Sequence, residues 1–128
     1  GDKLVVEAEA TPLYDGYLYV DFVQHDGTIL HMLPGPDRPN NAVKAGERIL
    51  IGNGPREYTI TPPYGTELLV VMSSPTPLFR SPRPQVEEAK GYLDDLKRAI
   101  EAAGKQSGAS PVVSSFAFIT AGPGKAPK

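Results

Sequence analysis

Apolar and polar residues alternate along much of the first half of the chain, and this period of two predicts β-strands. In the segment YLYVDFVQ, Leu18, Val20 and Phe22 share one face of the predicted strand. Tyr17 and Tyr19 lie on the opposite face. Similar segments occupy residues 3–10, 28–33, 47–52, 56–61 and 111–121. The pattern therefore indicates a protein built mainly from strands.

The residues between these segments are typical of turns that connect antiparallel strands. Asp26-Gly27 separates two alternating segments and predicts a hairpin, because glycine supplies the positive φ that such turns need. A second hairpin is predicted between residues 47–52 and 56–61, around the sequence NGP. The run Leu68–Ser74 is apolar nearly throughout, which predicts a strand that is covered on both faces.

One amphipathic helix is predicted at residues 85–104. Its apolar positions recur every three or four residues: Val86, Ala89, Leu93, Leu96, Ile100 and Ala103. Pro84 suits the start of this helix and Gly104 suits its end. We therefore expect a mainly β fold, an antiparallel immunoglobulin-like β-sandwich of about six or seven strands, with this helix before the last strand.

The stretch HMLPGPDRPNNAVKAGERI, residues 31–49, raises three alternatives: an interdomain linker, a phosphate-binding loop, or an ordered crossing within one fold. The strands on either side need the same core, which argues against a linker. Gly46 precedes a strand rather than a helix, which argues against phosphate binding. We expect an ordered crossing in which Val43 enters the core. The chain is then one domain over residues 1–121, followed by a flexible tail at 122–128.

Composition and charge exclude several classes of function. The chain has 128 residues, 13 basic and 15 acidic, and the basic residues form no stripe that would neutralise phosphates, so no nucleic-acid partner is expected. The absence of cysteine excludes disulfides, thiolate-bound zinc and a thiol nucleophile. No apolar run reaches the ~20 residues of a membrane span, so no membrane insertion of this segment is expected.

Few residues suit catalysis or metal binding. Of the two histidines, His25 lies at a predicted hairpin tip and His31 in a strand, and neither has visible convergent partners. The serines lack a nucleophile motif. Glu87 and Glu88 are placed on the solvent side of the predicted helix. No catalytic residue, metal ligand or cofactor is therefore predicted, and the chain is expected not to be an enzyme.

The tyrosines are the stronger candidates for recognition. Tyr17 and Tyr19 share a strand face that, if exposed, would suit a peptide, a glycan or a partner domain. The same face is equally suited to being covered by the helix or by a neighbouring loop. The candidate binding residues are Tyr17, Tyr19, His31 and Tyr58.

Four segments in order resemble a known family: DGYLYVDFVQHDGTILHMLP, NNAVKAGERI, PPYGTELLVVMSS and PTPLF. Together they cover roughly residues 14–79 and are similar to the bacterial domain of unknown function 4384. The continuation LFRSPRPQVEEAKGYLDDLKRAI is similar to a C-terminal extension of some proteobacterial members.

The resemblance implies an accessory domain of a larger bacterial protein. Such domains occur beside protein kinase, caspase-like peptidase or repeat modules, often in envelope-associated proteins. The expected function is sensing, or interaction with a protein partner, that regulates or localises the attached module. The alternative is a small-molecule or carbohydrate binding module that uses the tyrosine face. A periplasmic or cell-envelope location is expected, with the cytoplasm left open, and the oligomeric state does not follow from the sequence.

Overall fold

The computed structural model describes residues 3–36, 38–52, 58–59, 65–107 and 111–120. These residues form ten strands and one helix. The short strands are β1 (Lys3–Leu4), β5 (Ala42–Val43) and β7 (Tyr58–Thr59). The longer elements are β2 (Val6–Glu9), β3 (Gly16–Val23), β4 (Thr28–Leu33), β6 (Arg48–Ile51), β8 (Thr66–Ser74), β9 (Val86–Glu88), α1 (Ala89–Ser107) and β10 (Val113–Thr120). The predicted tail at 122–128 lies outside the described residues.

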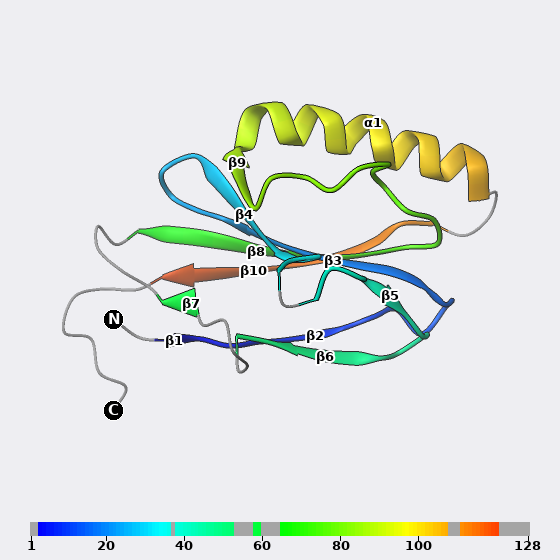
Figure 1. The fold of residues 1–128 in the computed structure, drawn as a ribbon, viewed down its shortest axis with the longest axis horizontal. Coiled ribbons are helices and arrows are strands. Elements are labelled where there is room, and N and C mark those ends of the chain that lie inside the picture. The colour runs from blue at the N-terminus through cyan, green and yellow to red at the C-terminus, as the bar shows by residue number, and fades with distance from the viewer. Residues whose placement is uncertain (1–2, 37, 53–57, 60–64, 108–110, 121–128) are drawn as a thin grey trace.

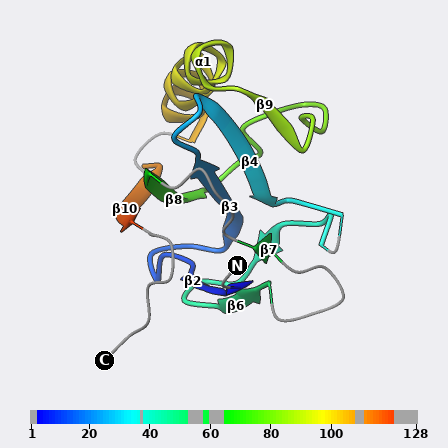
Figure 2. The same cartoon turned by 90° about the vertical axis from the view of Figure 1, so that its left-hand side faces the viewer.

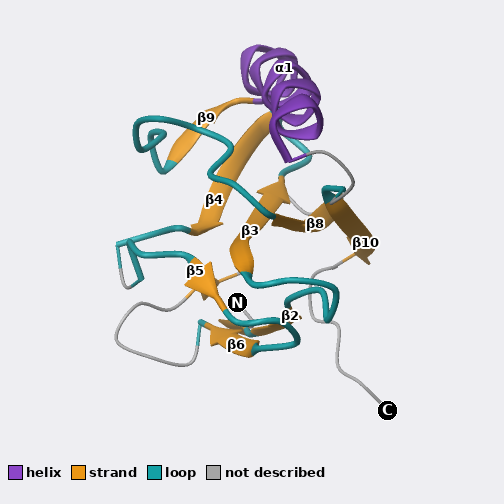
Figure 3. Ribbon diagram, turned by 90° about the vertical axis from the view of Figure 1, so that its right-hand side faces the viewer, coloured by secondary structure: helices purple, strands orange, loops and turns teal. Residues whose placement is uncertain are grey.

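The strands form one large sheet and two small ones, all antiparallel. The large sheet has the order β10-β8-β3-β4-β9, with β5 also paired to β3. The small sheets are β2-β6 and β1-β7. In Figure 1, α1 lies on one side of the large sheet and β2-β6 on the other. The end views agree (Figures 2 and 3). The predicted mainly β, antiparallel sandwich with one helix before the last strand is confirmed.

The face of the large sheet that looks toward β2-β6 forms the first core. Leu18, Val20 and Phe22 of β3 are buried there, as their alternation predicts. Ile49 and Ile51 of β6 belong to the same cluster. The small sheet thus buries the apolar face of β3.

The opposite face of the large sheet forms a second core beneath α1. Its buried members are Tyr19, Ile29, Met72, Leu78, Tyr92, Leu96 and Ala103. Tyr17 and Val23 are partly buried against them. The helix and the loop before it therefore bury Tyr19 but leave Tyr17 half-buried, so the tyrosine face is covered only in part.

The interior position of β8 in the large sheet also matches its sequence. This strand pairs with β3 on one side and with β10 on the other. Leu69 and Val71 pack toward the first core, and Val70 and Met72 toward the second. A strand covered on both faces has no need to alternate apolar with polar residues.

A β-bulge separates the two ends of the β3-β4 pair. The register shifts between Val20 and Asp21, so that Asp21 lies opposite His31 while Val20 lies opposite Leu33. His31 therefore lies on the helix side and Leu33 in the first core. At the bulge, the polar pair Asp21–His31 faces the helix, and the neighbouring apolar pair Val20–Leu33 faces the first core.

The proline-rich stretch after β4 is an ordered crossing, as predicted, although Asp37 lies outside the described residues. Val43 of β5 is buried in the first core and pairs with Gly16 of β3. Gly46 then has a φ of 75°, a left-handed conformation that glycine adopts without strain. The chain enters β6 directly after this turn.

The prediction of a hairpin between residues 47–52 and 56–61 is wrong within the described residues. β6 pairs with β2, and β7 pairs with β1. Burial explains the choice, because the β2-β6 pair brings Val6 and Ala8 together with Ile51 in the first core. β6 and β7 therefore pair with the N-terminal strands β2 and β1 and not with each other.

The predicted bounds of the helix, 85–104, are also wrong. Residues 86–88 form β9, which pairs with β4, and the helix runs from Ala89 to Ser107, so Gly104 does not end it. Four predicted positions of the apolar stripe, Ala89, Leu96, Ile100 and Ala103, do pack in the second core, but Tyr92 takes the place of Leu93. Tyr92 is buried, whereas Val86 and Leu93 are 52% and 48% exposed. No helix of the described residues is both long and apolar enough to cross a bilayer.

Candidate functional site

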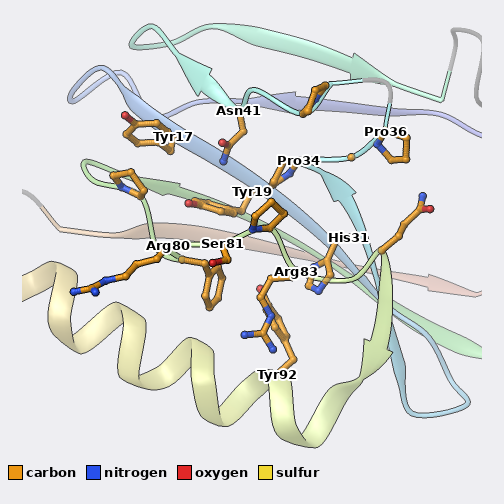
Figure 4. Close-up of a pocket in the computed structure, with 16 residues that line it drawn as sticks. Tyr17, Tyr19, His31, Pro34, Pro36, Asn41, Arg80, Ser81, Arg83 and Tyr92 are labelled. Carbon is orange, nitrogen blue, oxygen red and sulfur yellow. The ribbon is translucent and has the colours of Figure 1, made fainter.

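A pocket of about 550 Å³ opens on the helix side of the large sheet, between two proline-rich loops. Tyr17 and Tyr19 of β3 and His31 of β4 contribute from the sheet (Figure 4). The first wall is formed by residues of the 34–41 loop, and the second by residues of the 77–85 loop. Tyr92 of α1 lines the pocket as well. Its volume lies within the ~300–1,000 Å³ of small-molecule sites.

Proline gives both walls a fixed shape. Pro34, Pro36 and Pro39 line the first wall, and Pro77 and Pro82 line the second. Each proline ring fixes φ and removes a backbone N–H donor. The prolines of the walls therefore present apolar rings and no backbone N–H donors to the interior.

Aromatic rings complete the apolar lining. Tyr17 is half-buried and Tyr19 is buried. Phe79 packs edge-on against Tyr19, with 6.3 Å between the ring centroids, and lies 5.8 Å from the ring of Tyr92. Such rings offer large contact surfaces to an apolar or aromatic ligand at low conformational cost.

The second wall is anchored to the sheet and the helix. The backbone N–H of Leu78 donates to the Tyr19 hydroxyl at 2.8 Å, and the Leu78 side chain is buried. The guanidinium of Arg83 lies 5.0 Å from the centre of the Phe79 ring and 5.2 Å from that of Tyr92. This cation–π stacking holds the loop against α1.

The first wall is anchored to β3 by Asn41. The Leu18 backbone N–H donates to the Asn41 carbonyl, and the Asn41 side-chain amide donates back to the Leu18 carbonyl, both at 3.0 Å. Gly35 and Arg38 exchange two backbone hydrogen bonds of 3.1 Å within the loop. These hydrogen bonds fix the first wall to the sheet.

A buried charge network lies at the inner end of the second wall. His31 Nδ1 lies 2.8 Å from Asp21 Oδ1, and His31 Nε2 lies 2.6 Å from Glu87 Oε2. Asp21 and His31 are only 2% and 6% exposed. An imidazole between two carboxylates satisfies both by carrying a proton on each nitrogen. The geometry thus favours an imidazolium bridging β3, β4 and β9.

The electrostatics agree with this protonation state. Burial lowers the pKa of His31, but the hydrogen bonds and charges of Asp21 and Glu87 outweigh burial and raise the pKa above its ordinary value of 6.5. The hydrogen bonds from Arg83 are the main reason that the pKa of Glu87 is lowered from 4.5, and His31 adds to them.

Two further residues close the network. The Tyr92 hydroxyl donates to Asp21 Oδ2. Arg83 donates to both oxygens of Glu87, at 2.9 and 2.6 Å, and to Asp95 at 3.0 Å. Each buried charge therefore has a partner of opposite sign, which is the condition for burying charge at all.

This network holds the pocket in shape and offers no base to a substrate. Both ring nitrogens of His31 are occupied by carboxylates, so neither is free to accept a substrate proton. Within the described residues, no group of acidic and histidine side chains has the arrangement of a metal site.

The structure brings together three of the four predicted binding residues. Tyr17, Tyr19 and His31 all line the pocket. Tyr58 lies elsewhere: it pairs with Leu4 across β1-β7 and packs against the first core. A tyrosine in a two-residue strand gave no sequence signal of which face it would join.

The sequence did not identify Asp21, Glu87 or Tyr92 as parts of the site. The placement of Glu87 on the solvent side of a helix is wrong, because Glu87 lies in β9 and contacts His31. One available signal was an acidic residue inside an otherwise apolar strand, as Asp21 is, which calls for a buried partner. Another was Tyr92, three residues after Ala89 and four before Leu96, on the apolar stripe.

Residues 1–77 match the family described as Domain of unknown function (DUF4384). No curated protein and no solved structure matches the chain. The matched residues contain the sheet side of the pocket and its first wall, and the match ends at Pro77, where the second wall begins. Because the match covers more than half of the chain, the protein belongs to the DUF4384 family.

Proposed function

We propose that this chain is a non-catalytic recognition domain of a larger bacterial protein, and that its pocket binds a small, mainly apolar ligand. Ligand binding would supply a sensing input to an attached module, such as a kinase or a peptidase-like domain. The observation that supports this proposal is the pocket between the two proline-rich loops, with Tyr17, Tyr19 and Phe79 in its lining.

Preorganisation supports ligand binding. Both walls are tied to β3, one through Asn41 and the other through Leu78. A pocket whose walls are already ordered loses little conformational entropy on binding, so more of the contact energy remains as affinity.

The state of the polar side chains supports a non-catalytic role. His31 is bonded on both nitrogens, and the Tyr92 hydroxyl is bonded to Asp21. Ser81 lines the pocket, but within the described residues no hydrogen bond joins it to a histidine that would activate it.

The test is ligand-observed NMR with three probes of one shape and different charge: 2-naphthamide, 2-naphthoate and 2-naphthylmethylammonium. We expect at least one to bind the purified chain, and Tyr17→Ala to weaken that binding about tenfold through the loss of one aromatic contact. Leu50→Ala is the control, because Leu50 is an exposed apolar residue on the far sheet. Absence of binding by all three probes, or equal loss in both variants, would overturn the proposal.

A protein partner is the second candidate. The observation that favours it is the strand β10, which forms one edge of the large sheet and carries Phe116 at 64% exposure. The test is binding of the separately produced remainder of the full-length protein. Phe116→Asp should weaken this binding while leaving probe binding in the pocket unchanged. Equal binding by the wild type and Phe116→Asp would show that β10 is not the contact surface.

A further inference from the structure

We infer that the ligand of this pocket is a small organic anion, with an aromatic or other apolar body and one carboxylate that pairs with Arg80. This inference rests on the proposed function and adds the chemical class of the ligand. It follows from the charged side chains and hydrogen-bond donors of the pocket that are not already paired within the protein.

Among the lining residues that the structure describes, three side chains can carry positive charge and none carries negative charge. The three are His31, Arg80 and Arg83. His31 is neutralised by Asp21 and Glu87. Arg83 is neutralised by Glu87 and Asp95, at 2.6 and 3.0 Å. The charges of these two residues are therefore already compensated within the protein.

Arg80 is different. It lines the pocket and is exposed, and within the described residues its guanidinium forms no hydrogen bond or ion pair. A guanidinium presents paired N–H donors that match the two oxygens of a carboxylate. In the view of Figure 4, Arg80 and Tyr17 lie at the same end of the pocket, and the Arg80 side chain extends outward at the rim. An anion at Arg80 would leave the apolar body of the ligand against the Tyr17 and Phe79 rings.

Among the described lining residues, the uncharged polar side chains that form no hydrogen bond are Tyr17, Ser81 and Gln85, which are few for a ligand rich in hydroxyls. The Tyr19 hydroxyl, the Asn41 amide and the Tyr92 hydroxyl are engaged within the protein. The five lining prolines offer no N–H. A sugar buried here would leave many hydroxyls without partners, at a cost for each. An apolar acid needs only one strong polar contact, which Arg80 can supply.

The experiment compares 2-naphthoate with 2-naphthamide by isothermal titration calorimetry on the full chain. The two probes have nearly the same shape, so the ratio of their dissociation constants isolates the negative charge. We expect the wild type to favour the carboxylate by about tenfold, the size of one charge-assisted hydrogen-bonded contact. Arg80→Gln should bring the ratio close to one by weakening only the anion.

Arg48→Gln is the matched control. It makes the same change in net charge on the far sheet, where Arg48 is exposed, and it should leave the ratio as in the wild type. Equal binding of the two probes by the wild type would overturn the inference while leaving the proposed function intact. A preference for the anion that survives Arg80→Gln would also overturn it. Failure of both probes, together with the ammonium probe, would instead overturn the proposed function.

Discussion

His31 connects three strands on the helix side of the molecule. It is buried and is the only cation that contacts Asp21 among the described residues. Its second nitrogen contacts Glu87, so one ring joins β3 and β4 to β9. Removing the ring would leave a buried carboxylate without its counter-charge.

We expect His31→Leu to lower the free energy of unfolding by about 3–5 kcal/mol, the usual cost of breaking a buried ion pair on one side. Urea unfolding followed by circular dichroism measures this change. His25→Leu is the control, because His25 is exposed and contacts a single carboxylate, that of Glu67, and pairs with an exposed partner are worth about 1 kcal/mol or less. Similar losses in the two variants would show that the His31 network does not stabilise the fold.

The network should also make stability depend on pH. The pKa of His31 is raised in the fold, so its contribution is complete below pH 6.5 and is lost as the pH rises through the higher folded-state pKa. The pKa of Glu87 is lowered, so its contribution is complete above pH 4.5 and is lost as the pH falls. We therefore expect the wild type to lose more unfolding free energy than His31→Gln between pH 6.5 and pH 9. Parallel curves for the two proteins in chemical denaturation would contradict this.

At the scale of elements, α1 contains a glycine with no structural need to be one. Gly91 lies near the start of the helix, and a Cβ added there would meet nothing within 4 Å. Gly91→Ala should raise the free energy of unfolding by about 0.5–1 kcal/mol, because alanine loses less conformational freedom in a helix. Thermal and urea unfolding measure the gain.

Gly46→Ala is the matched comparison, since a Cβ at Gly46 also meets nothing within 4 Å but its φ is +75°. This variant should destabilise the chain through backbone strain. If both substitutions change the free energy of unfolding in the same direction, the explanation by helix propensity at Gly91 and backbone strain at Gly46 is wrong.

The elements also show how far the sequence predicts the fold. The strands with strict alternation, above all β3, were predicted because one face meets a core and each residue carries that information locally. The start of α1 was not predictable in the same way. Residues 85–88 fit a helix by periodicity, but Val86 pairs with Leu30 and Glu87 contacts His31, both distant in the sequence. Tertiary contacts outweigh local propensity there.

The sequence predicted the part of the site that lies on β3 but not the part that lies on the loop before α1. Tyr17 and Tyr19 were identified because their strand face was visible in the alternation. Phe79 and Arg83 were not, because a proline-rich loop has no periodicity that shows which of its side chains fold back onto the sheet.

For the whole molecule, the family match and the fold have different boundaries. The match ends at residue 77, yet Leu78, Tyr92 and Leu96 belong to the second core, and β10 pairs along nearly the whole length of β8. We therefore expect residues 1–77 alone not to fold cooperatively, because Tyr19, Ile29 and Met72 would face water. A chain ending at residue 121 is the control and should unfold with the transition of the full chain. A sharp thermal transition and dispersed NMR signals for residues 1–77 would contradict this expectation.

The layered architecture holds the two proline-rich loops in place as the walls of the pocket. The large sheet supplies a rigid base, α1 and the charge network hold the second wall, and Asn41 holds the first. The pocket therefore depends on both the family region and the segment that follows it.

The most direct test of this pocket is to locate a bound probe by intermolecular nuclear Overhauser effects, with 2-naphthoate added to ¹³C-labelled protein. We predict contacts from the naphthalene ring protons to Tyr17, to Phe79 and to proline rings of both walls. Contacts confined to exposed apolar residues outside the pocket, such as Leu50 or Phe116, would contradict the proposed site, as would the absence of any contact.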